Sequence, residues 1–260
     1  TILTTANVKI LYVNVRGLDW QKRVHLFDQA DESTLIFAAE TWHTASVGSG
    51  PFPLLANTEE ARVRGKDVLG RRHGGLALWA GAAIQPLISN IQTSRYSITV
   101  TIHRRVIHAV YLPPTLDKGA SEAHSVKAYL RPPDRSIPDI LIGDINTRFG
   151  KRFGDRESGP QARLRVVRDL CREQALTHHV PAPDSPSLVT VDHLFTRPGI
   201  SAVLKARWLD KEKLSTDHPL LEVYASWSKE TPTEPSAPAA AAHRPSSPLD
   251  PTVRPTERLQ

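Results

Sequence analysis

The stretch DILIGDIN, residues 139–146, is the part of the sequence that best indicates the fold, because polar residues directly follow a strand-like apolar run. Its first half, Asp139–Ile142, is mostly apolar and predicts a buried β-strand. Asp144 and Asn146 follow that strand at once. A polar side chain at the end of a buried strand is held rigidly at the edge of the sheet, where a ligand can reach it. For each such residue taken alone, a turn residue or a cap is the alternative.

The same pattern recurs at other strand-like runs of the chain. Asn14 and Glu40 each follow an apolar run, Asp192 lies within LVTVDHLF, and Asp217 and His218 precede PLLEVYA. Several carboxylates at one sheet edge repel each other and need a cation. Oxygen ligands suit Mg²⁺, with Mn²⁺ as the alternative, better than zinc. A histidine beside an aspartate can orient a phosphate oxygen or take a proton.

The apolar pattern predicts many strands and two helices. The strand candidates are Val8–Val13, Leu35–Ala39, Gly75–Trp79, Ser97–Ile102, Val106–Tyr111, Asp139–Ile142, Leu188–Phe195 and Leu220–Tyr224. One helix is expected over Asp19–Ala30, with Asp19 as N-cap and Val24, Phe27 and Ala30 facing inward. The other is expected over Gln161–Ala175, with Leu164, Val167, Leu170 and Cys171 on one face and Arg163, Arg165, Arg168 and Arg172 around it. This mixture predicts an α+β fold with layered sheets.

Composition limits the class of protein. The chain has 260 residues, a net charge of +6 and a single cysteine, which excludes a disulfide scaffold. No apolar run approaches the roughly 20 residues that cross a bilayer, so no membrane partner is expected. The positive charge favours an anionic partner, nucleic acid above all. The absence of methionine suggests a processed product, an expressed fragment or a piece of a longer reading frame.

The composition changes near Lys229. Seven of the 21 prolines fall within residues 229–260. Such a stretch buries too little apolar surface to offset its ordering entropy. We therefore expect one folded domain over residues 1–228 and a disordered tail or linker rich in Pro, Ala and Thr over residues 229–260.

The polar residues belong to segments that together resemble the endonuclease/exonuclease/phosphatase superfamily. In order, these segments are NVRGL (14–18), AETW (39–42), HGGLALW (73–79), VYLPP (110–114), GDIN (143–146), VDHLF (191–195) and STDHP (215–219). The resemblance implies a four-layered α/β/β/α sandwich. It departs from the apurinic-endonuclease branch at Pro114, where that branch has asparagine.

The resemblance also implies a metal site. Glu40 would be the principal metal ligand, Asn14 would support it, and Asp217 would be a second carboxylate of the site. The implied cofactor is Mg²⁺, with Mn²⁺ as the alternative.

Catalytic roles follow from the same resemblance. Asp144 would position or deprotonate the attacking water, and Asn146 would hold the scissile phosphate. Tyr111 would contact the phosphate. Asp192 would orient the catalytic histidine, His218.

Basic loops near these motifs favour a polynucleotide substrate. The loop before Gly74 carries Arg62, Arg64, Lys66, Arg71 and Arg72, and the segment after GDIN carries Arg148, Lys151, Arg152 and Arg156. We expect Arg71, Arg72, Arg148, Lys151 and Arg152 to contact nucleic acid. For any one of them, a solvated surface residue is the alternative.

The chain is most similar to the endonuclease domains of non-LTR retrotransposons. That similarity implies a Mg²⁺-dependent enzyme that nicks DNA and leaves a 5′-phosphate and a 3′-hydroxyl. It also implies a reverse transcriptase domain in the same parent polyprotein and an intracellular, nuclear location. The alternatives are an RNA deadenylase, a phosphoinositide-type phosphatase, or an inactive remnant that only binds nucleic acid.

Overall fold

A computed structural model of the chain describes residues 5–42, 48, 50–58, 62–63, 72–114, 116, 126–149, 161–182, 191–209 and 215–228. The chain divides into two compact units, Thr1–Lys229 and Glu230–Gln260, and every described residue belongs to the first. The tail expected over residues 229–260 lies outside the described residues, so its disorder stays a prediction.

The first sheet has six strands and contains the N-terminal strand. In spatial order they are β13 (Ser201–Arg207), β14 (Leu220–Ser228), β1 (Thr5–Asn14), β2 (Thr34–Ala39), β6 (Leu76–Ala80) and β3 (Leu54–Asn57). β1 runs parallel to β2, and the other neighbours are antiparallel.

The second sheet also has six strands. In spatial order they are β11 (Thr177–His178), β12 (Asp192–Thr196), β10 (Ile140–Asp144), β9 (Arg105–Tyr111), β8 (Ser97–Ile102) and β7 (Ile88–Thr93). β10 runs parallel to β9, and the other neighbours are antiparallel. β4 (Arg62–Val63) and β5 (Arg72–His73) form a separate antiparallel pair.

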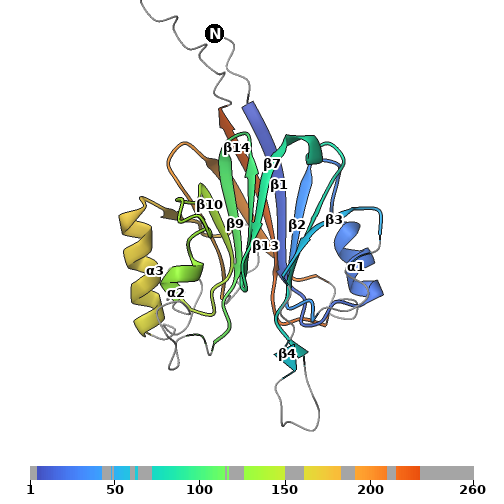
Figure 1. The fold of residues 1–260 in the computed structure, drawn as a ribbon, viewed down its shortest axis with the longest axis horizontal. Helices are drawn as coiled ribbons and strands as arrows, with labels where there is room; N and C mark the ends of the chain where they lie inside the picture. Colours follow the sequence, from blue (N-terminus) through green and yellow to red (C-terminus); the bar gives the residue numbers. More distant parts are fainter. Residues whose placement is uncertain are drawn as a thin grey trace, which may run out of the picture. The chain divides into compact units, whose positions relative to one another are not determined.

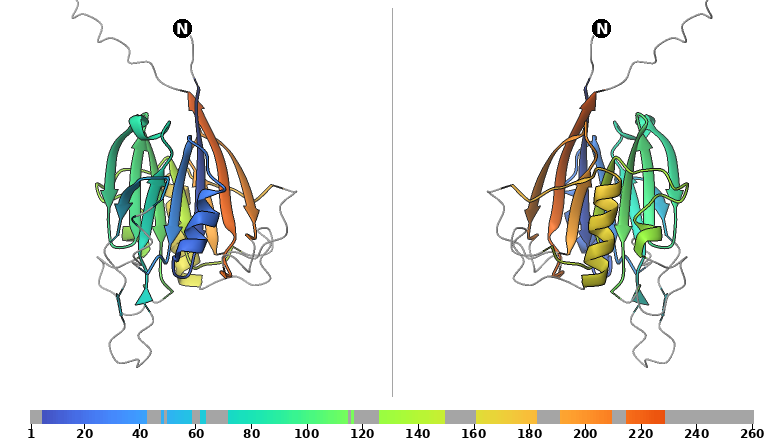
Figure 2. Two further views of the ribbon diagram at one scale, coloured as in Figure 1. Left: turned by 90° about the vertical axis from the view of Figure 1, so that its right-hand side faces the viewer. Right: turned by 90° about the vertical axis from the view of Figure 1, so that its left-hand side faces the viewer.

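The two sheets stack face to face, and helices cover their outer faces (Figure 1). Helix α1 (Trp20–Phe27) lies outside the first sheet, while α2 (Val126–Tyr129) and α3 (Gln161–Glu173) lie outside the second. Figure 2 shows each outer face in turn, with α1 in front in one view and α3 in the other. A short 3-10 helix, η2 (Gln85–Leu87), precedes β7. The expected four-layered α+β sandwich is therefore confirmed.

Strand alternation explains the layers. In β1, Val8, Ile10 and Tyr12 point into the core between the sheets, while Leu11 and Val13 pack in the core beneath α1. A third core lies between the second sheet and the helices α2 and α3. Each sheet thus buries apolar side chains on both faces, which is why its central strands are apolar almost throughout.

The eight predicted strands correspond to the eight interior strands of the two sheets. One of them is shorter than expected: β12 starts at Asp192, whereas the prediction started at Leu188. Residues 188–190 lie outside the described residues.

Helix α1 begins after the predicted N-cap, since Asp19 Oδ1 accepts a hydrogen bond from the Lys22 amide. The predicted inward face is partly wrong. Val24 is exposed, and Leu26 is buried beside Phe27 in its place. Lys22 and Arg23 are buried as well, so a hydrophobic pattern alone could not locate the inner face of this short helix.

Helix α3 buries Leu164, Val167 and Leu170 as predicted, with Cys171 partly buried against them. One of the four arginines placed around this face is not on the surface: Arg163 is almost fully buried. None of the helices in the described ranges has the length and hydrophobicity that crossing a bilayer requires.

Candidate active site

The predicted site residues meet at one edge of both sheets. Asn14 ends β1 beside Ala39, the last residue of β2, and Glu40 follows directly. In the second sheet, Asp144 at the end of β10 is paired with Tyr111 on one side and with Asp192 on the other. The carboxyl ends of the parallel strands in the two sheets thus lie together, as the strand-end pattern predicts.

Asp144 lies at the centre of this edge. Its Oδ2 accepts a hydrogen bond of 3.0 Å from Asn14 Nδ2, and its Oδ1 accepts one of 2.9 Å from the Asn146 amide. Burial penalises the charged carboxylate and Asp192 repels it. Together they outweigh the favourable effects of His218 and the hydrogen bonds, and raise the pKa of Asp144 to about 8. The metal-free site therefore favours the protonated form of this carboxyl group far more than water does.

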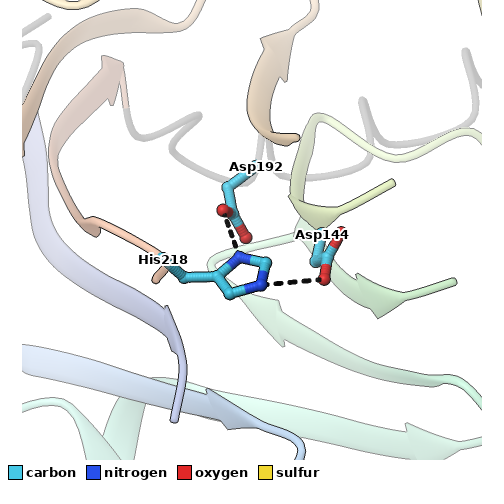
Figure 3. Close-up of side chains that lie close together, drawn as sticks. All are labelled: Asp144, Asp192 and His218. Carbon is cyan, nitrogen blue, oxygen red and sulfur yellow. Dashed lines mark hydrogen bonds and ion pairs between the residues drawn. The ribbon is translucent and has the colours of Figure 1, made fainter. Parts of the chain in front are cut away.

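His218 is held between two aspartates (Figure 3). Its Nδ1 lies 2.7 Å from Asp192 Oδ2, and its Nε2 lies 4.0 Å from Asp144 Oδ2. Burial lowers the pKa of His218, but the charge of Asp192, its hydrogen bond, and the charges of Asp144 and Asp217 outweigh burial and raise it to about 9. With Asp192 ionised, Nδ1–H donates to it, which leaves Nε2 directed at Asp144.

Tyr111 and Glu40 join the two sheets at this edge. The Tyr111 hydroxyl donates a hydrogen bond of 2.7 Å to Glu40 Oε1. Burial and the nearby Glu40 carboxylate raise the pKa of Tyr111 well above its usual range. The phenol therefore stays protonated and remains a hydrogen-bond donor.

The backbone around the site adopts an uncommon conformation. Glu40 and Asn146 have φ angles of 52° and 51°, and Gly143 has φ of 148°. A Cβ at Gly143 would clash with the Val110 carbonyl oxygen, so β10 needs glycine there. Asn146 tolerates a left-handed backbone and donates from Nδ2 to the Leu112 carbonyl at 2.9 Å. Within GDIN, backbone geometry thus requires Gly143 and favours Asn146.

Sequence reasoning missed Tyr12, which connects the sheets behind Asp144. Its hydroxyl accepts a hydrogen bond of 2.9 Å from the Asp144 amide and donates one of 2.8 Å to the Val110 carbonyl. The alternation of side chains along β1 could have indicated this role, because Tyr12 lies on the same face of the strand as Ile10 and Asn14. A phenol on a face that enters the core needs a polar partner there.

Arg163 was also missed. From α3, its guanidinium donates to the carbonyls of Leu112, Pro113 and Ile145 at 3.2, 2.9 and 2.8 Å. It therefore joins the loop that follows Tyr111 to the loop that carries Asn146. An arginine in a helix rich in arginines gives no sign that it will be buried, so the pattern could not single it out.

Asp217 is arranged differently from the buried carboxylates. Its side chain is 67% exposed, and its Oδ1 lies 2.9 Å from an Arg16 guanidinium nitrogen. The same oxygen lies 3.8 Å from His218 Nε2. Asp217 thus belongs to the rim of the site.

The predicted nucleic-acid residues can be located only in part. Arg148 is exposed, two residues after Asn146. Arg72 lies in β5, where only the backbone is described. Arg71, Lys151 and Arg152 lie outside the described residues.

The donor set fits a divalent cation. Asp144, Asp192 and His218 each offer a ligand atom, and these atoms lie within 4.8 Å of one another. Asp144 and Asp192 repel each other in a buried setting, which is a repulsion that a cation relieves. Glu40 adds a further carboxylate across from Tyr111.

The chain is similar in structure to several solved nucleases and phosphatases. The endonuclease domain of TRAS1, a telomere-specific non-LTR retrotransposon, matches with a TM-score of 0.55 at 14% identity, over 86% of this chain and all of that one. A 3′ phosphatase, NExo from Neisseria, bound to a product DNA hairpin, matches at 0.55 and 12% identity, over 83% and 98%. NExo from Neisseria meningitidis, described as a 3′-5′ exonuclease, matches at 0.53 and 12%, over 83% and 98%.

The chain has the endonuclease/exonuclease/phosphatase fold. Identities this low establish the fold alone. No protein-family model matches the sequence, and no curated protein matches it either. The activity of this endonuclease/exonuclease/phosphatase-fold protein must therefore be argued from its site.

Proposed function

We propose that the protein is a divalent-metal-dependent phosphodiesterase that nicks DNA. The observation that supports this most strongly is the Asp192–His218 pair, with its carboxylate buried, facing Asp144 at the common edge of the two sheets. A base, a cationic donor and several carboxylates in one position suit the hydrolysis of a phosphodiester.

Asp144 would serve as the general base. A water molecule loses a proton to Asp144 while its oxygen forms a bond to phosphorus. The bond between phosphorus and the 3′-oxygen breaks, and that oxygen takes up a proton from solvent. The products are a 5′-phosphate and a 3′-hydroxyl. A pKa near 8 for Asp144 suits this role, because a general base works best when its pKa is close to the working pH.

Three groups would donate hydrogen bonds to the phosphoryl oxygens as negative charge develops. His218 stays protonated at neutral pH beside Asp192, and Tyr111 stays protonated beside Glu40. Asn146 completes the set, and its amide is oriented by the Leu112 carbonyl. Groups already oriented in the free protein need little reorganisation during the reaction.

We infer that Glu40, with Asn14 and Asp217 nearby, would hold the cation, Mg²⁺ or Mn²⁺. When bound, a cation of this kind neutralises phosphate charge and stabilises the leaving oxygen. In this assignment Asp144, Asp192 and His218 keep their catalytic roles and do not bind the cation, and Asp144 is oriented by the hydrogen bonds from Asn14 and the Asn146 amide.

DNA is the substrate that the observations favour. The net charge of +6 suits a phosphate backbone. The structural neighbours include the endonuclease domain of a telomere-specific retrotransposon, TRAS1, and NExo bound to a product DNA hairpin. We further propose that the domain nicks target DNA for a non-LTR retrotransposon in the nucleus, as part of a polyprotein with a reverse transcriptase.

Incubation with supercoiled plasmid and Mg²⁺ tests the activity. We expect nicking that EDTA abolishes and that Asp144→Ala or His218→Ala lowers by about 100-fold or more, because each variant removes a group that acts in the transition state. DNA ligase should reseal the nicks, since it requires a 5′-phosphate and a 3′-hydroxyl.

Asp169→Ala is the matched control, because Asp169 pairs with Arg172 on the outer helix α3. It should nick like the wild type. Nicking by Asp144→Ala at the wild-type rate would refute the assigned roles. A folded wild type that leaves plasmid intact would redirect the search to RNA and phosphoinositide substrates, and binding without cleavage would indicate an inactive remnant.

A further inference from the structure

Arg16 lies in the turn that joins β1 to α1, beside the catalytic edge. Its amide donates a hydrogen bond of 3.1 Å to Asn14 Oδ1, and the Gly17 amide donates one of 2.7 Å to the Glu40 carbonyl. Buried Lys22 Nζ donates to the carbonyls of Val15 and Gly17 at 2.8 and 2.9 Å. Hydrogen bonds with Asn14, Glu40 and Lys22 therefore hold the backbone of this turn in place. They fix the position of the Arg16 Cα atom beside the site.

The Arg16 guanidinium lies at the rim of the site. It is 2.9 Å from Asp217 Oδ1, and that same oxygen is 3.8 Å from His218 Nε2. One carboxylate therefore separates the guanidinium from the imidazole. The Arg16 side chain is 38% exposed and Asp217 is 67% exposed, so water and a ligand can both reach the pair.

Stability does not explain this ion pair. Pairs this exposed contribute little to folding because water and salt screen them. A guanidinium carries five N–H donors in a planar fork that matches two phosphate oxygens. At this rim it would meet the backbone of a polynucleotide whose scissile phosphate lies at His218.

We propose that Arg16 binds a phosphate of the polynucleotide next to the one that is hydrolysed, and that Asp217 holds the guanidinium ready in the free protein. The proposal rests on the proposed function. The phosphate takes the place of the carboxylate at the guanidinium. Asp217 keeps its second oxygen for the cation, because the contacts with Arg16 and His218 both involve Oδ1.

Binding of a fluorescent DNA duplex in EDTA, followed by anisotropy over a range of salt concentrations, tests the proposal without cleavage. We expect Arg16→Ala to weaken binding about tenfold at low salt. The slope of log affinity against log salt should fall by about 0.9, the change for one phosphate contact. Arg16→Lys should keep the slope but bind less tightly than the wild type, because it keeps the charge and loses the fork.

In the nicking assay, Arg16→Ala should raise KM with little change in kcat, since it removes a contact made equally in the ground and transition states. Arg172→Ala is the control, because Arg172 is 80% exposed on α3 in an ion pair with Asp169. It should match the wild type in both assays. Thermal melting confirms that each variant is folded.

The outcomes separate this inference from the proposed function. Wild-type nicking together with a wild-type slope and KM in Arg16→Ala would overturn the role of Arg16 alone. A loss confined to kcat would also overturn it, because Arg16 would then act on the chemical step. A wild type that neither nicks nor binds DNA would overturn both proposals.

Discussion

Tyr12 is the side chain whose loss should show how the two sheets keep Asp144 in position. We predict that Tyr12→Phe lowers the free energy of unfolding by about 1–3 kcal/mol, because it leaves the buried Asp144 amide and Val110 carbonyl without this partner. The rate constant kcat should fall too, since the Asp144 backbone loses a support. Urea unfolding and nicking kinetics measure the two effects.

Tyr224→Phe is the control for this prediction. The Tyr224 hydroxyl bonds to Glu222 on the outer face of the first sheet, and the side chain is 45% exposed. Its loss should change stability little and leave nicking unaffected. If Tyr12→Phe behaved in the same way, the phenol bridge would have no part in positioning Asp144.

At the residue scale, the sequence indicates the groups at strand ends and misses those that act through backbone carbonyls. Asp144 and Asp192 are visible because a carboxylate directly beside an apolar run is conspicuous. Tyr12 and Arg163 bond to main-chain atoms from distant segments. Any residue has such atoms, so no residue pattern marks the partner.

Among the elements, α3 affects the site through one side chain. We predict that Arg163→Met lowers the free energy of unfolding by about 2–3 kcal/mol, because three buried carbonyls lose a charged donor. It should also lower kcat, since Asn146 and Arg163 share the Leu112 carbonyl. Urea unfolding and nicking rates test both parts.

Arg165→Met is the matched control, because Arg165 lies one half-turn along the same helix and is exposed. It makes the same chemical change without disturbing the loops. Equal effects of the two substitutions would mean that α3 supports the site only by its packing. If only Arg163→Met lowers stability and kcat, then the Arg163 guanidinium is the group through which α3 supports the loops of the site.

Helix α1 shows why the start of a helix is easier to predict than its inner face: the N-cap is where the sequence predicts it, although the helix ends at Phe27 and not at Ala30. Asp19 caps the helix by a local hydrogen bond, which a residue type next to a helical stretch reveals. Lys22 is buried because its ammonium group satisfies carbonyls of the preceding turn. These carbonyl groups belong to the turn and not to the helix, so the spacing of apolar residues in α1 does not indicate that Lys22 is buried.

At the scale of the whole molecule, the strands that the sequence missed within the two sheets are their edges. β13 and β3 border the first sheet, and β11 and β7 border the second. Interior strands are covered on both faces, so their sequences are continuous apolar runs that are easy to recognise. Edge strands are short or carry polar side chains that disfavour pairing with another strand, so their sequences resemble loops. The resemblance implied the four layers, but the order of the strands within each sheet was not predicted, because apolar runs do not specify their neighbours.

The buried charges of the site should make the stability of the metal-free protein depend on pH. The pKa of Asp144 is raised from 3.8 to about 8, so between these values the folded state holds a proton that the unfolded state has released. Stability must then fall as pH rises through that range. His218 acts in the same direction: its stabilising effect is complete below 6.5 and is lost as pH rises through about 9.

We therefore predict that the melting temperature in EDTA decreases as the pH is raised from 5 to 9. Adding Mg²⁺ should raise the melting temperature more at pH 9 than at pH 5. A cation held by Glu40 at the same edge would favour the charged form of Asp144, so it should stabilise the folded state most where Asp144 has lost its proton. Asp144→Asn should reduce the pH dependence in EDTA to the part that His218 contributes, because one of the two titrating groups is gone. Thermal melts of both proteins, with and without Mg²⁺, measure this. A wild-type melting temperature that Mg²⁺ leaves unchanged at both pH values would argue against a metal at this edge, since the buried carboxylates would then tolerate their charge unaided.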